Sequence, residues 1–135
     1  NYEYFSRSPN GGMIRRRKDL KPYEVLGCMV RINHDSDYMR EMIVEHLVQH
    51  HLSAISMDNY MLWTKKNKPF AYATWIMEPE TRIYHMAAPY GDVLKLCRDL
   101  KDYLINEKNI YNVRFIRRDK NGKVRRNGSI SKRKQ

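Results

Sequence analysis

The sequence predicts one domain of the α/β (α+β) class, in which a mostly antiparallel sheet carries two main helices. Its 135 residues are enough for one compact domain and leave no room for a second. Apolar residues make up 41% of the chain and charged residues 30%, which is typical of a globular protein with its own core. The segments with strand or helix character follow one another as strand, helix, three strands, helix and strand. Because consecutive strands joined by short turns pair antiparallel, this order predicts the fold class.

The first strand and the first helix are predicted between residues 24 and 51. The segment Glu24–Ile32 is rich in residues that favour β-structure and is bounded by turn-forming residues, so we expect it to form the first strand. Asp35, Ser36 and Asp37 then supply capping oxygens and negative charge to a helix that ends near His51. The apolar face of this helix comprises Met39, Met42, Ile43, His46, Leu47 and His50.

A hairpin and a further strand are predicted next. Tyr60–Thr64 and Phe70–Met77 have strand composition, and Lys65–Lys68 between them has the composition of a turn. Glu78–Glu80 then turns the chain into a third consecutive strand, Arg82–Ala88.

A second helix and a last strand complete the predicted domain. Asp92 is expected to cap a helix that extends to about Lys108, and Tyr111–Arg118 is expected to form the strand after it. One face of the helix carries Val93, Leu96, Cys97, Leu100 and Leu104.

The net charge of +11 is concentrated at the two ends of the chain. Residues 1–23 carry six basic and two acidic side chains, residues 110–135 carry ten and one, and residues 24–109 have a net charge of −2. We therefore expect a basic arm over residues 1–23 and a basic tail over residues 119–135, both available to nucleic acid or another polyanion. The candidate contact residues are Arg15, Arg16, Arg17, Lys18, Arg117, Arg118, Lys123, Arg125, Arg126, Lys132, Arg133 and Lys134.

Other features exclude several classes of protein. The longest apolar runs fall short of the roughly 18 residues that span a bilayer, so no membrane span is predicted. Cys28 and Cys97 lie far apart without a metal-ligand spacing, and free thiols suit the cytoplasm or a particle assembled inside the cell. His46 and His50 lie one helical turn apart without an HExxH pattern, so no metal site is predicted.

Four groups of residues form an ordered pattern along the chain. They are Glu24–Gly27, then Pro69–Trp75 (P-F-A-Y-A-T-W), then Ala88–Asp92 (A-P-Y-G-D), and finally Ile116–Asp119 with Gly122–Val124. Over residues 24 to about 128, this set resembles the RTX toxin-activating lysine acyltransferases, the hemolysin-activating type of protein.

The resemblance implies a GNAT-like (acetyltransferase-like) fold for residues 24–118. It also implies transfer of a fatty acyl group from acyl carrier protein to the ε-amine of a lysine in an acceptor protein. No bound cofactor is then required, because the carrier protein itself is the donor, and the enzyme is expected to be a homodimer.

The resemblance also places the candidate site residues. The family's S-P-x-H-R motif falls on residues 36–40, so that its histidine corresponds to Met39 with Arg40 after it, and its aspartate corresponds to His85. A thioether cannot accept a proton, whereas an imidazole can, so His85 is the candidate base. The segment Ala88, Pro89, Tyr90, Gly91 and Asp92 is the candidate acyl-donor loop. The alternative is that His85 is an ordinary strand histidine and Met39 an ordinary core residue.

Two hypotheses on function remain open at this point. In the first, the protein is an acyl-carrier-dependent lysine acyltransferase, active or lapsed, with its site around Met39, Arg40, His85 and the acyl-donor loop. In the second, it is a non-catalytic assembly subunit of a virion or ribonucleoprotein that contacts nucleic acid or neighbouring subunits through its basic ends.

Overall fold

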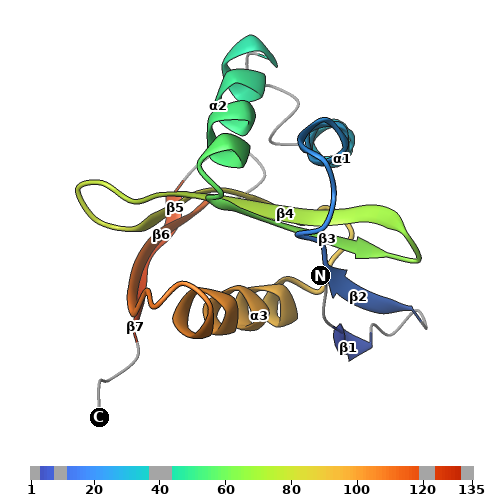
Figure 1. Ribbon diagram of the computed structural model, residues 1–135. Helices are drawn as coiled ribbons and strands as arrows, with labels where there is room; N and C mark the ends of the chain where they lie inside the picture. Colours follow the sequence, from blue (N-terminus) through green and yellow to red (C-terminus); the bar gives the residue numbers. More distant parts are fainter. Residues whose placement is uncertain (1–3, 8–11, 37–43, 119–123, 132–135) are drawn as a thin grey trace.

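The computed structural model describes residues 4–7, 12–36, 44–118 and 124–131, which form one sheet with helices on both of its faces (Figure 1). The strands are β1 (Tyr4–Arg7), β2 (Met13–Arg16), β3 (Tyr60–Lys65), β4 (Lys68–Ile76), β5 (Arg82–Ala87), β6 (Asn112–Arg118) and β7 (Val124–Ser131). The helices are α1 (Pro22–His34), α2 (Val44–Ser56) and α3 (Val93–Asn106). This architecture confirms the predicted α+β class, and α3 and the strands β3 to β6 lie where the sequence predicts them.

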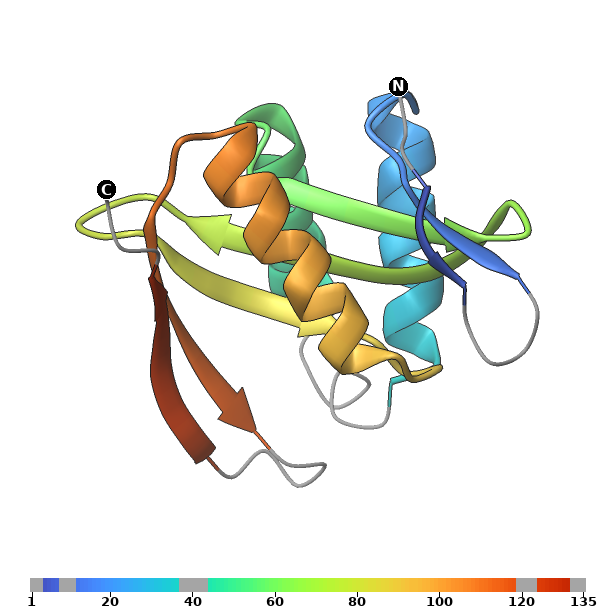
Figure 2. The ribbon, with the colours of Figure 1, turned by 90° about the horizontal axis from the view of Figure 1, so that it is seen from below.

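The strands lie in the sheet in the same order as in the chain. Neighbouring strands are antiparallel except for β5 and β6, which are parallel because α3 lies between them in the chain. The register of β5 and β6 rests on the single pair Arg82 and Arg114, and the two strands diverge beyond it (Figure 2).

Two apolar cores lie on opposite faces of the sheet, because successive side chains of a strand point to opposite sides. On one face, Leu62 and Tyr72 pack against Met29 of α1 and Leu47 of α2. The other core includes Ile14, Met61, Trp63, Phe70, Ala71, Ala73, Trp75, Leu96, Leu100, Tyr103, Leu104 and Val113, and α3 covers it. Figure 1 shows α1 and α2 above the sheet and α3 below it. Among the described residues, no helix is long and apolar enough to cross a membrane.

The prediction of a first strand at Glu24–Ile32 is wrong, because these residues belong to α1. Pro22 lies in the first turn of α1, and the backbone N–H of Lys21 donates to the Glu24 side chain over 3.1 Å, which marks a helix start. The buried residues Val25, Met29 and Ile32 recur at helical spacing. Packing of this face against the sheet outweighs the β-propensity of valine and isoleucine. The domain therefore has three helices in the described residues, where two main helices were predicted.

The other helix of this layer, α2, extends beyond the predicted end near His51. It ends at Ser56 because Ala54 continues its buried face, and Asp58 then adopts a φ of 57°. Asp35, which was predicted to cap the start of this helix, is instead the C-cap of α1, and the predicted first turn at residues 37–43 lies outside the described residues.

Residues 1–23 and 119–135, predicted as a basic arm and a basic tail, both contribute strands to the sheet. At the N-terminal end, β2 pairs with β3, and Ile14 is fully buried in the core under α3. At the C-terminal end, β7 pairs along the length of β6, and Gly128 leaves room for the ring of Phe115 on the facing strand. Backbone pairing and one close contact thus order residues whose own composition is too polar to form a core.

Candidate active site

The candidate acyl-donor loop, Ala88–Asp92, connects the end of β5 to the start of α3. Gly91 adopts a φ of +100°, which a residue without a side chain tolerates, and its N–H donates to the carbonyl of Ala88 over 3.3 Å. Asp92 has a φ of 60° and its carbonyl accepts from the N–H of Leu96, but its side chain does not cap the helix as the sequence predicted. The loop therefore makes a tight turn that brings the first turn of α3 close to the end of β5.

The gap between β5 and β6 widens toward this same loop. The two strands meet at Arg82 and Arg114, where the Arg114 N–H donates to the carbonyl of Thr81 over 3.0 Å. Because the strands are parallel and separate from there onward, their carboxyl ends lie apart (Figure 2). Beyond Arg82, the edge of β5 that faces β6 is thus not paired in register with β6 in the described strands.

A β-bulge in β5 determines which way the polar side chains of this strand point. Thr74 pairs with His85 and Trp75 pairs with Ile83, so that Tyr84 is the extra residue of the bulge. A bulge breaks the strict alternation of side chains. Tyr84 and His85 consequently both reach the same residue of α2, His50.

His50 lies at the centre of this polar cluster between α2 and the sheet. Its ring centroid is 4.0 Å from that of Tyr84 and 5.3 Å from that of His85. Its Nε2 lies 2.9 Å from the hydroxyl oxygen of Thr74 on β4, which holds the ring in place. His85 is 9% exposed, whereas His50 is half-buried and Tyr84 is 47% exposed. The cluster therefore extends from the interior to the surface.

Burial keeps these imidazoles neutral. Desolvation lowers the pKa of His50, and desolvation together with the charge of His50 lowers the pKa of His85 to about 4. His51 has a pKa of about 4 for the same reasons, with both neighbouring histidines opposing a further charge. At neutral pH the three rings therefore carry lone pairs and no charge.

His51 itself belongs to a structural network below the cluster. Its Nε2 lies 3.0 Å from the hydroxyl oxygen of Tyr72, and this hydroxyl donates to Oδ1 of Asn33 on α1 over 2.7 Å. Its Nδ1 is buried without a partner. Its Nε2 also lies 3.3 Å from the amide Nδ2 of Asn33. This network joins α1, α2 and β4 beneath the site.

The structure brings only some of the predicted site residues together. His85 lies in the histidine cluster, and the acyl-donor loop begins shortly after it at the end of the same strand. Tyr90 of the loop donates its hydroxyl to the Asp35 carboxylate at the end of α1. Met39 and Arg40 lie outside the described residues.

Three residues of the cluster were missed from the sequence as site residues. They are His50, Thr74 and Tyr84, and the available signal was weak: His50 was considered only as a metal ligand, and Thr74 and Tyr84 are ordinary strand residues by composition. In the described residues, no group of histidine, cysteine and carboxylate side chains is arranged to hold a metal ion.

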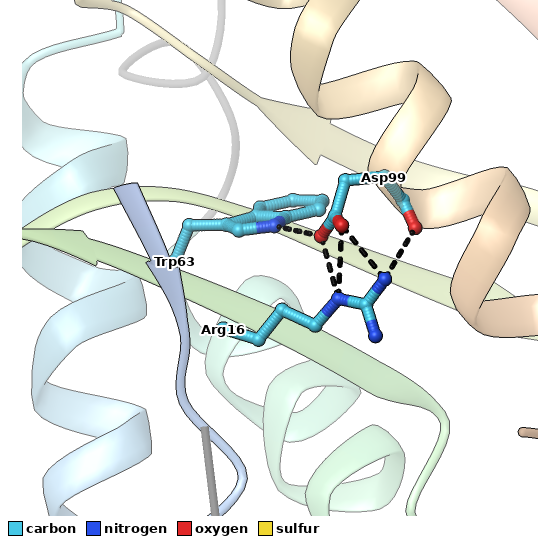
Figure 3. A network of polar contacts seen from close by, with 3 residues as sticks. All are labelled: Arg16, Trp63 and Asp99. Carbon is cyan, nitrogen blue, oxygen red and sulfur yellow. Dashed lines mark hydrogen bonds and ion pairs between the residues drawn. The ribbon is translucent and has the colours of Figure 1, made fainter. Parts of the chain in front are cut away.

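The N-terminal basic run is largely engaged inside the domain. Arg16 of β2 donates from Nε and Nη2 to the carboxylate of Asp99 on α3 over 2.7 to 3.0 Å, and the indole N–H of Trp63 donates to the same carboxylate over 2.8 Å (Figure 3). The side chains of Arg16 and Asp99 are 12% and 2% exposed. This network ties β2 and β3 to α3.

The neighbouring basic residues also have acidic partners. Arg17 pairs with Asp19 over 3.0 Å, and Lys18 donates to the carboxylate of Asp58 over 2.5 Å. Among the C-terminal candidates, Arg117, Arg118, Arg125 and Arg126 belong to β6 and β7. Lys123, Lys132, Arg133 and Lys134 lie outside the described residues.

Comparison with known proteins relates this site to one family. No curated protein matches the chain. The RTX toxin acyltransferase family matches residues 18–86, which span α1, α2, the hairpin of β3 and β4, and β5 as far as the residue after His85. The match covers half of the chain and includes the histidine cluster, and it confirms the resemblance inferred from the sequence motifs. The chain belongs to the RTX toxin acyltransferase family.

Proposed function

We propose that the protein is a GNAT-like acyltransferase of the cytoplasm that moves an acyl group from acyl carrier protein to a lysine ε-amine of an acceptor protein. The observation that carries the proposal is the separation of β5 from β6 beside the start of α3, in a chain whose residues 18–86 match an acyltransferase family. A second supporting feature is the histidine cluster on the same strand, β5.

The edge of β5 that faces β6 suits the prosthetic arm of a carrier protein. This arm is extended, contains amide groups and is attached through a phosphate. An exposed strand edge binds amides through its N–H and carbonyl groups, as in strand addition. The phosphate is attracted by the N-terminus of α3, where the acyl-donor loop leaves backbone N–H groups free of the helix ladder. The thioester at the end of the arm then lies along β5, the strand that carries His85.

The proposed reaction is acyl transfer to nitrogen. The neutral lysine nitrogen attacks the thioester carbonyl carbon, the C–N bond forms, the C–S bond breaks and the thiolate leaves. The proton lost by the nitrogen passes to a base, and the base returns a proton to the thiolate. His85 is the base that the sequence predicts, and its neutral state at pH 7 supplies the lone pair that this step needs.

The test is transfer of label to protein. The purified protein is incubated with acyl carrier protein that bears a radiolabelled long or short acyl chain, and with lysate as the source of acceptors. Label that resists neutral hydroxylamine marks an amide. We expect such label with the native protein, a strong loss with His85→Gln, and no change with His46→Gln, whose side chain is exposed on α2. Absence of amide-linked label with every acyl chain refutes the proposal.

One observation favours the second candidate, contact with nucleic acid. The β6–β7 hairpin pairs Arg117 with Arg126, with Arg118 and Arg125 beside them, at one end of the sheet. A two-stranded ribbon with arginines suits a phosphate backbone. Several phosphate contacts predict that DNA or RNA affinity falls by orders of magnitude between about 50 and 200 mM salt. An affinity that is constant over this range refutes this second candidate.

A further inference from the structure

Two imidazoles in contact with each other are the most unusual feature of the site among the described residues. His50 and His85 come from different elements and meet at a ring-centroid distance of 5.3 Å. The groups that face them are Thr74 of β4, Tyr84 of β5 and His51 of α2. Among the described residues, the ring contacts and hydrogen bond found for His50 and His85 are with these three residues and with each other.

His50 is the more exposed ring of this pair. His85 is almost completely buried and packs against the Tyr84 ring, at a centroid distance of 4.5 Å. His50 is half-buried at the edge of α2. When Nε2–H of His50 donates to the Thr74 hydroxyl, its Nδ1 keeps the lone pair. A proton that arrives from solvent or substrate therefore meets His50 first and His85 behind it.

We propose that His50 and His85 form one proton-accepting centre for acyl transfer, in which His50 meets the lysine nitrogen and His85 shares its proton. The inference rests on the proposed function and adds a residue from α2 to the site. Repulsion between two adjacent imidazolium rings opposes charging both at once, so the pair takes up a single proton first, and burial moves this uptake below the ordinary imidazole pKa.

The proposed acyl transfer accounts for the proton that the lysine nitrogen loses. After the lysine nitrogen has bonded to the carbonyl carbon, it carries a positive charge and an acidic N–H. His50 takes this proton, the C–S bond breaks, and the departing thiolate takes the proton back as a thiol. The overall change converts thioester and lysine ammonium into amide, thiol and one released proton. Thr74 is a positioning residue in this scheme, because it holds the His50 ring and does not touch the substrate.

The experiment combines rates with titration of the individual rings. We measure kcat/KM of acyl transfer as a function of pH for His50→Gln, Thr74→Val and the exposed control His46→Gln. General base catalysis contributes roughly 10²-fold or more, so we expect His50→Gln to lose about that factor and His46→Gln to lose nothing. Thr74→Val is expected to lower kcat more than it raises KM. Far-UV circular dichroism and the melting temperature establish that each variant is folded.

NMR titration of the imidazole protons tests the pairing without any activity. We expect the pKa of His85 to rise in His50→Gln, because the charge of His50, which opposes protonation of His85, is removed. A His85 titration curve that is identical in the native protein and in His50→Gln overturns the pairing. Native acyl transfer together with an undiminished rate in folded His50→Gln overturns the role of His50 and leaves the proposed function standing. Absence of transfer by the native protein overturns the proposed function and, with it, the catalytic role of the pair.

Discussion

The histidines beneath α2 are expected to make the folded protein sensitive to mild acid. His51 and His85 have a pKa of about 4 in the folded state, against an ordinary value of 6.5. Because the folded state takes up these protons later than the unfolded state, the free energy of unfolding decreases as the pH falls from about 6.5 toward 4, and the loss levels off below 4. Above pH 6.5 both states are neutral at these positions and the contribution vanishes.

The size of the effect follows from these values. One pKa unit corresponds to about 1.4 kcal/mol, so each ring costs ~2 kcal/mol at pH 5 and ~3 kcal/mol once the pH is below 4. His51 is fully buried and His85 is 9% exposed, so solvent screening reduces these figures little. At pH 5 both rings are mostly neutral in the folded state, so their two contributions add to about 4 kcal/mol. Domains of this size have a total stability of about 5–15 kcal/mol.

Urea unfolding at several pH values between 7.5 and 4.5 measures this directly. We expect the free energy of unfolding to fall by about 4 kcal/mol between pH 7.5 and pH 5, and the fall to be roughly halved in His85→Gln. The exposed His46→Gln is the control and retains the full fall. The lowered pKa values of Asp19, Asp35 and Asp58 do not add to this fall, because these carboxylates take up protons only at lower pH. A free energy of unfolding that is equal at pH 7.5 and pH 5 would show that the rings are not buried as described.

Three further predictions concern other parts of the domain. Asp99→Asn is expected to lower the free energy of unfolding by about 3–5 kcal/mol in urea titrations, because it removes the charge from the buried carboxylate that pairs with the partly buried guanidinium of Arg16; a loss below about 1 kcal/mol contradicts this. Gly128→Ala places a Cβ 2.8 Å from the phenylalanine ring on the facing strand. We expect the free energy of unfolding to fall by about 1–3 kcal/mol in the same assay. An unchanged midpoint would mean that the ring moves aside. Tyr90→Phe removes the hydroxyl that donates to the Asp35 carboxylate. In an NMR titration, we therefore expect the pKa of this carboxyl to rise toward its ordinary value. An unchanged pKa would show that the contact does not form in solution.

Much of the sheet was predictable because its signals are local. The hairpin of β3 and β4 has two apolar runs around a polar turn, and α3 has apolar residues at helical spacing. For α1, local signals conflicted, since Glu24–Ile32 has β-forming residues at positions that a helix buries on one face. The helix prevails because its buried face packs against β3 and β4, and this packing is not visible in the segment itself.

The two ends of the chain show a different limit of prediction from the sequence. Composition predicted that residues 1–23 and 119–135 are solvated arms, since they contain few apolar residues. The prediction missed that one buried residue, Ile14, and one ion pair, Arg16 with Asp99, are enough to fix β2 beside β3. Charge density alone therefore does not distinguish a basic residue that is available to bind a ligand from one that pairs with an acidic residue within the fold.

Only part of the candidate site could be predicted from the sequence. His85 was found because a motif placed it, but its contact with His50 depends on how α2 lies across the sheet and on the bulge at Tyr84. A bulge is set by one extra residue in strand pairing, and strand register is not encoded in composition. The pairing of the two rings therefore required the three-dimensional structure.

A neutral imidazole pair constrains the order of events in acyl transfer. A base with a pKa well below that of a lysine ammonium, about 10.4, does not remove a proton from free lysine to a useful extent. Once the nitrogen has bonded to the carbonyl carbon, its N–H becomes far more acidic, and a weak base is then sufficient. A base of low pKa is also a good proton donor once charged, which suits the return of the proton to the departing thiolate. In the proposed reaction, the imidazole pair of His50 and His85 is therefore suited to the step after attack.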